Sequence, residues 1–256
     1  MKLYTTFLRS QSFMSSDKSS LPDSSKLSAA AKAQKNIYCV SGLGADRRVF
    51  TKLQFEGYRP VHLEWLSPET GETLPDYAKR LAAKIEDEKP ILIGLSFGGI
   101  VAIEIAKQIA VEKLILISSV KTTSENPWYF RLFSWFPVHL LIPFKSLLWA
   151  VYWVIDWFFS LENAAERQLF KTILADTDAN FLRWAINRVV LWRNETIPQN
   201  TYHIHGTGDR IFPMTFISPD VIVERGGHFM IMNRAERVSQ IIDRIISKRH
   251  QQADVL

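Results

Sequence analysis

Short apolar segments that alternate with segments of helical periodicity are the feature that most constrains the fold of this 256-residue chain. Strand-like segments occur at residues 36–40, 61–65, 91–95, 113–120, 201–205 and 221–224, and helix-like segments between and after them at 46–53, 75–87, 98–110 and 235–248. Apolar strands separated by helices are typical of a parallel sheet covered on both faces. We therefore predict an α/β fold with a mostly parallel sheet of about six strands and helices on both faces.

The alternation stops after residue 120 and resumes only near residue 201. The intervening residues have helical periodicity, and Asp178 stands where it can cap a helix that carries an apolar stripe. We therefore expect one α/β domain at 36–256, with a helical, aromatic-rich cap inserted at about 121–198, rather than two domains in tandem.

The first 35 residues differ in composition from the rest and contain nine serines but no Trp, Val or Ile. Such a segment buries too little apolar surface to offset the entropy of ordering, so a disordered tail is expected, with a targeting segment as the alternative. Residues 1–36 also carry six Lys or Arg and two Asp, which accounts for most of the chain's net charge of +5. The remaining charges are mixed, and we expect no nucleic-acid partner.

Cys39 is the single cysteine, which excludes an internal disulfide and fits a reducing compartment. We expect a cytoplasmic protein on this ground. No Cys and His residues have the spacing of zinc ligands, so neither a structural nor a catalytic metal is expected.

Residues 94–99 read Gly-Leu-Ser-Phe-Gly-Gly and place Ser96 in a G-x-S-x-G motif. The motif alone is weak, but here it lies between an apolar strand and a helix, which is the context it requires. A serine on so sharp a turn needs neighbours without side chains, and Gly94 and Gly98 provide them. Neither phosphate-loop pattern is present, so a nucleophilic serine is favoured over a phosphate-binding turn.

A serine hydroxyl needs a base to take its proton, and His228 is the candidate among six histidines. It follows two glycines at the end of a predicted strand, the edge where parallel sheets place their chemistry. Asp209 lies in a glycine-containing loop after the preceding strand and would orient His228, with Glu125 as the rival acid. His205 is expected to brace the loop of Asp209.

Three stretches together resemble the α/β-hydrolase superfamily: GLSFGG at 94–99, HGTGDRIFP at 205–213 and GGH at 226–228. The resemblance covers about residues 36–248 and implies a central parallel sheet, an inserted helical cap and no cofactor. The chain departs from the family in two ways. Ser41 stands where many members have histidine, and the 35 residues before Asn36 are not strand-like, so we expect a sheet without the usual first two strands.

Acyl transfer in this architecture uses two backbone amides to stabilise the oxyanion. One comes from the residue after the nucleophile, here Phe97. The other comes from the loop after an early strand, where Leu43 is the candidate donor and Gly42 gives the backbone its freedom.

Residues 127–160 contain five of the eight tryptophans. These aromatic residues could form the core of the cap, roof an apolar substrate pocket or contact a membrane surface, and the sequence leaves all three open. Trp128, Trp135 and Trp153 are the candidate substrate-binding residues. The apolar run at 146–159 is too short to span a bilayer.

These features predict a serine hydrolase that cleaves an ester or thioester with an apolar acyl or alcohol part through an acyl-serine intermediate. Two alternatives remain open: a lyase or C–C bond hydrolase that uses the same three residues, and a non-catalytic protein that binds an apolar ligand. The expected partner is a small apolar molecule of the ester type.

Overall fold

The computed structural model describes residues 34–130 and 152–247. Nearly all of the predicted N-terminal tail, together with Trp135, lies outside these ranges. In the described residues, no helix combines the length and the apolar character needed to cross a membrane.

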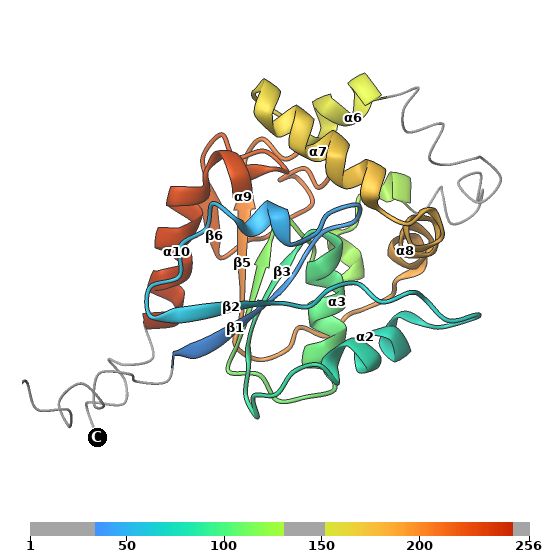
Figure 1. The fold of residues 1–256 in the computed structure, drawn as a ribbon, viewed down its shortest axis with the longest axis vertical. Coiled ribbons are helices and arrows are strands. Elements are labelled where there is room, and N and C mark those ends of the chain that lie inside the picture. Colours follow the sequence, from blue (N-terminus) through green and yellow to red (C-terminus); the bar gives the residue numbers. More distant parts are fainter. Residues whose placement is uncertain (1–33, 131–151, 248–256) are drawn as a thin grey trace, which may run out of the picture. The chain divides into compact units, whose positions relative to one another are not determined.

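A six-stranded sheet forms the centre of the fold, in the order β2-β1-β3-β4-β5-β6 (Figure 1). The strands are β1 (Lys35–Val40), β2 (Tyr58–His62), β3 (Ile91–Leu95), β4 (Lys113–Ile117), β5 (Thr201–Gly206) and β6 (Val221–Val223). All five neighbouring pairs are parallel. The predicted parallel sheet of about six strands is therefore confirmed.

The two edge strands of this sheet differ in length. β2 pairs only with β1, and its exposed Pro60 lies opposite Ile37. Proline has no amide hydrogen, so it is tolerated in a sheet mainly at such an edge. β6, at the other edge, has three residues.

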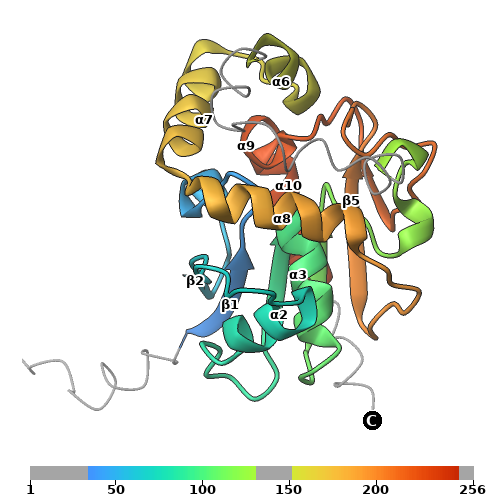
Figure 2. The same ribbon diagram turned by 90° about the vertical axis from the view of Figure 1, so that its right-hand side faces the viewer.

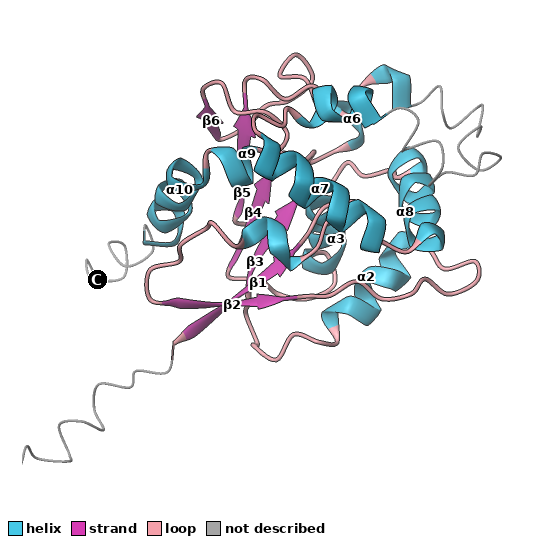
Figure 3. Cartoon of the chain, turned by 45° about the horizontal axis from the view of Figure 1, so that its top comes forward, coloured by secondary structure: helices cyan, strands magenta, loops and turns pink. Residues whose placement is uncertain are grey.

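Helices cover both faces of the sheet, as Figure 3 shows by colour. One face packs against α10 (Ala235–Ser247), the short α9 (Met230–Asn233) and the 3-10 helix η1 (Arg47–Phe50). The other face packs against α2 (Leu74–Ala82), α3 (Phe97–Ala106) and α8 (Ala179–Leu191). Strands buried on both faces explain the continuous apolar runs, because neither set of alternate side chains meets water.

Between β4 and β5 the chain forms the short 3-10 helix η2 (Thr123–Glu125) and then the α-helices α6 (Tyr152–Phe159), α7 (Ala164–Asp176) and α8. The carboxylate of Asp178 accepts a hydrogen bond from the amide of Phe181 at 2.7 Å, so its predicted role as the cap of α8 is confirmed. α7 and α8 reach the loop after β1, because leucines of both helices approach Gly44. Figure 2 shows α6 and α7 beyond one end of the strands, with α8 crossing below them.

Candidate active site

The turn between β3 and α3 holds Ser96 in an uncommon backbone conformation, with φ 51° and ψ −119°. A residue other than glycine at positive φ is strained and persists only where its surroundings fix it. Three hydrogen bonds fix this turn. The Ser96 amide donates to the Ile117 carbonyl at 2.9 Å, and the Ser96 carbonyl accepts from Ser119 Oγ at 2.7 Å and from the Gly99 amide at 2.9 Å.

Glycines on both sides of Ser96 allow strand and helix to approach each other. A Cβ atom on Gly94 would lie 2.5 Å from the Cα of Gly99, and one on Gly98 would overlap the carbonyl oxygens of Val40 and Ser41. The glycines of the motif are therefore required by backbone contacts, in agreement with the steric argument from sequence.

The structure brings Ser96, His228 and Asp209 together. The Ser96 Oγ lies 2.9 Å from His228 Nε2, and His228 Nδ1 lies 2.8 Å from Asp209 Oδ2. A carboxylate can only accept, so Nδ1 carries the proton and Nε2 accepts from the Ser96 hydroxyl. The three side chains come from loops that follow β3, β5 and β6 at the carboxyl edge of the sheet.

Asp209 is buried, and its carboxylate lies close to two backbone amides and two histidine rings. Its Oδ1 accepts from the amides of Ile211 and Phe212, each at 2.9 Å, and His205 Nε2 lies 3.6 Å from Oδ2. Burial favours the neutral acid, but the charge and hydrogen bond of His228, with the contributions of His205 and the Phe212 amide, outweigh it and lower the pKa of Asp209. Asp209 is therefore a carboxylate at neutral pH.

Glu125, the rival acid, is engaged elsewhere. Its carboxylate accepts from the amides of Lys121 at 2.6 Å and Ser218 at 3.2 Å. It has no contact with His228, so the geometry favours Asp209 as the partner of the histidine.

The residues predicted for the oxyanion site lie beside Ser96. Leu43 and Phe97 both line the cavity that contains Ser96, and a Cβ on Gly42 would lie 3.4 Å from the Ser96 Cβ. Phe97 is the first residue of α3, so its amide has no acceptor within the helix. Among the described residues, no carbonyl accepts from the Leu43 amide.

A small apolar cavity of about 100 Å³ opens onto Ser96 and His228. It is lined by Leu43, Ser96, Phe97, Ile100, Phe130, Phe159, Ile186, Val189, Val190, Ile211, Phe212 and His228. Its walls thus come from the sheet domain and from α6 and α8. Such a lining suits an apolar group held beside the serine.

Two of the tryptophans proposed for substrate binding, Trp128 and Trp153, do not line this cavity. Trp128 is 65% exposed and Trp153 is 75% exposed, and Trp135 lies outside the described residues. Phenylalanines provide the aromatic walls instead, two of them from the same aromatic-rich segment. The sequence shows the enrichment but not which side chains face inward, because tertiary packing sets the rotation of each helix. Contact of the exposed tryptophans with a membrane surface stays a prediction.

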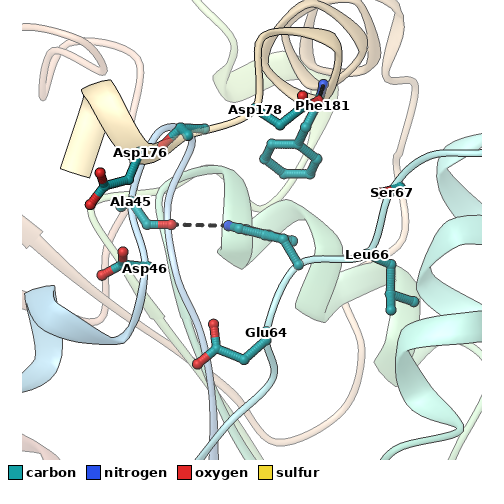
Figure 4. A pocket seen from close by; sticks show the side chains of 10 residues that line it. Ala45, Asp46, Glu64, Leu66, Ser67, Asp176, Asp178 and Phe181 are labelled. Carbon is teal, nitrogen blue, oxygen red and sulfur yellow. Dashed lines mark hydrogen bonds between the residues drawn. The ribbon is translucent and has the colours of Figure 1, made fainter.

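A second cavity, of about 210 Å³, has an acidic lining (Figure 4). Asp46 and Asp176, two of its four carboxylates, bind Arg48. Trp65 lines this cavity, donates from Nε1 to the Ala45 carbonyl at 3.1 Å and packs against Phe97. Ser96, Asp209 and His228 do not line this second cavity. In the described ranges, no three His, Cys, Asp or Glu side chains are grouped to hold a metal ion.

Residues 37–241 match the model of the alpha/beta hydrolase family. The chain belongs to the α/β-hydrolase family. The matched range includes Ser96, Asp209 and His228 and every residue of the cavity at Ser96. A search of curated proteins found no sequence match to this α/β-hydrolase.

Solved structures share the fold at low sequence identity. A candidate lipase from Acinetobacter baumannii is 14% identical, with a TM-score of 0.65 and 86% of each chain covered. An esterase from Thermogutta terrifontis is 19% identical, with a TM-score of 0.62 over 84% of this chain and 90% of that one. An esterase from Exiguobacterium antarcticum is 18% identical, with a TM-score of 0.61 over 83% and 92%. These likenesses show the α/β-hydrolase fold, but not the substrate.

Proposed function

We propose that this α/β-hydrolase cleaves an ester or thioester with an apolar acyl or alcohol part, through an acyl-serine intermediate. The observation that carries the proposal is the hydrogen-bonded chain from Ser96 through His228 to Asp209, at 2.9 and 2.8 Å. Mere binding of an apolar ligand requires none of these three groups in this arrangement. Proteins described as esterases among the structural neighbours lend further support.

The reaction follows from the proton positions. Ser96 Oγ attacks the carbonyl carbon while His228 Nε2 takes the hydroxyl proton, and Asp209 stabilises the resulting imidazolium without being protonated. The amides of Leu43 and Phe97 would stabilise the oxyanion, each contributing about 2.7–4 kcal/mol by analogy with other such sites. His228 then protonates the leaving alcohol or thiol, and a water activated by His228 releases the acid from Ser96.

We also propose that the helices between β4 and β5 act as the cap of this site. Phe159 of α6 and Ile186, Val189 and Val190 of α8 line the cavity at Ser96. The ring of Phe159 also contacts His228 edge to face, with 5.3 Å between ring centroids. The cap would hold the apolar part of the substrate and exclude water from the acyl-serine.

Labelling with a fluorophosphonate probe tests the serine directly. The purified protein should be labelled at one site, Ser96→Ala should not react, and Ser67→Ala, which alters an exposed serine, should be labelled like the wild type. Label that persists in Ser96→Ala would refute the assignment.

A panel of p-nitrophenyl esters of varied acyl length then tests the reaction class. We expect turnover by the wild type and by Ser67→Ala, and its loss in Ser96→Ala. Labelling without ester turnover would instead favour the lyase or C–C bond hydrolase, and an unlabelled protein that binds fatty acids would favour a binding function.

A further inference from the structure

Two histidines of β5 are buried behind Asp209 and take part in no step of the proposed reaction. His203 and His205 are both 0% exposed. Because residues two apart on a strand project to the same face, their rings lie side by side, and His205 Nδ1 is 3.2 Å from His203 Nε2. Most buried polar groups are hydrogen-bonded within the protein, so the contacts of these two rings indicate what they do.

One carbonyl defines the proton positions on both rings. His205 Nε2 lies 2.8 Å from the carbonyl oxygen of Phe212, which can only accept, so Nε2 carries a proton. In the neutral ring Nδ1 is then an acceptor, and it accepts from the Nε2–H of His203. Burial, the largest effect, lowers the pKa of His205 although Asp209 opposes the shift, which keeps the ring neutral.

The peptide groups of Phe212 connect His205 to the acid. The Phe212 amide donates to Asp209 Oδ1 at 2.9 Å, while its carbonyl accepts from His205. His205 Nε2 also lies 3.6 Å from Asp209 Oδ2, the oxygen that accepts from His228. His205 therefore contacts both the loop that holds the carboxylate and the oxygen that orients the base.

We propose that His205 is a positioning residue for this hydrolase: it fixes residues 209–212 through the Phe212 carbonyl and so aligns Asp209 Oδ2 with His228. His203 would hold His205 in the required tautomer. The inference rests on the proposed function, because alignment of the acid matters only if His228 acts as a base.

The test compares His205→Leu with His205→Gln. Glutamine can place an amide N–H near the position of Nε2 and so keep the bond to Phe212, whereas leucine cannot. Because small misplacements of reacting groups can cost about 100-fold, we expect kcat of His205→Leu, per serine titrated with the fluorophosphonate, to fall roughly 10- to 100-fold with KM nearly unchanged. His205→Gln should recover most of the loss.

The pH profile provides a readout that a purely structural role would not move. A misaligned Asp209 stabilises protonated His228 less, so the acid-side fall of kcat/KM should shift to lower pH in His205→Leu and return in His205→Gln. The other titratable groups that influence the two buried histidines are Asp209 and His228 near His205, and Lys121 near His203. All three are unchanged in both variants. Equal kcat per titrated serine and equal profiles in wild type and His205→Leu would overturn the proposal, as would a glutamine variant as impaired as the leucine one.

A measurement on the wild type remains decisive if His205→Leu does not fold. In ¹⁵N NMR of histidine-labelled protein, the ring signals of His205 are assigned as those that disappear in His205→Gln. In the wild type they should report a neutral ring with the proton on Nε2 over roughly two pH units around neutrality. A neutral Nδ1–H tautomer would overturn the proposal. Failure of the proposed function is separate, since it appears as a wild type that neither reacts with the probe nor hydrolyses esters.

Discussion

Replacing Gly98 by alanine tests whether close backbone contact at the serine turn positions the oxyanion loop. A Cβ atom at Gly98 would lie well inside 3.0 Å of the carbonyl oxygens of Val40 and Ser41, and real Cβ atoms essentially never approach other atoms so closely. Both contacts are backbone atoms at the end of β1, where the loop of Leu43 begins. They cannot yield by rotating a side chain, so the loop and α3 must move apart.

The expected magnitude follows from the displacement. Relief of the overlap requires a shift on the order of 1 Å, and a misplacement of that size at a reacting centre costs about 100-fold in rate. That factor corresponds to about 2.7 kcal/mol of activation free energy, close to the value of a single oxyanion donor. Overpacking should also lower the free energy of unfolding by about 1–3 kcal/mol.

Rates and stability should be measured together, with kcat referred to the serines titrated by fluorophosphonate and stability measured by urea unfolding. Gly71→Ala is the matched control, because Gly71 has a φ of 75° but nothing within 4 Å of a Cβ placed there. It should lose about 1–2 kcal/mol of stability from backbone strain and keep its kcat. If folded Gly98→Ala has the kcat of the wild type, clearance at this glycine does not position the oxyanion loop.

Two further predictions concern the buried histidines and the cavity. Burial lowers the pKa of both His203 and His205 from the ordinary value of 6.5, so the unfolded chain binds more protons than the folded one. The free energy of unfolding should therefore fall as the pH drops below 6.5, by up to about 1.4 kcal/mol per pH unit for each ring. Urea unfolding between pH 7 and pH 5 checks this, and a slope in His205→Gln as steep as in the wild type would contradict it. Phe159→Ala should raise KM for an apolar p-nitrophenyl ester roughly tenfold through lost apolar contact, whereas exposed Trp153→Ala should change it less than about twofold. Equal KM values in these two variants would refute the assignment of the cavity.

The sheet was largely predictable because its strands are buried on both faces and therefore read as apolar runs. The edge strand β2 lies at 58–62 rather than at the predicted 61–65, because Arg59 and Pro60 break the apolar pattern but still lie in register with β1. β4 ends at Ile117, three residues before the apolar run ends, because Ser118 turns the chain at a φ of 48°.

The proximity of Ser96, Asp209 and His228 could be anticipated because parallel strands bring their carboxyl ends to one edge. The residues that line the cavity could not be predicted from the sequence. Ile186 and Val190 of α8 line the cavity at Ser96 because of how the helix packs, and no local pattern distinguishes them from the other apolar residues of the same helix. The exposed Trp153 shows the converse, since aromatic enrichment alone does not say which rings face solvent.

The ends of the described sheet have a consequence for self-association. An unpaired strand edge is a template on which another chain can add by backbone hydrogen bonds, with aggregation as the risk. At the β2 edge, Pro60 lacks an amide hydrogen and Arg59 adds a charge. At the β6 edge, the strand has three residues and so offers few backbone groups for pairing. Both edges of the described sheet are therefore poorly suited to adding a strand from another chain.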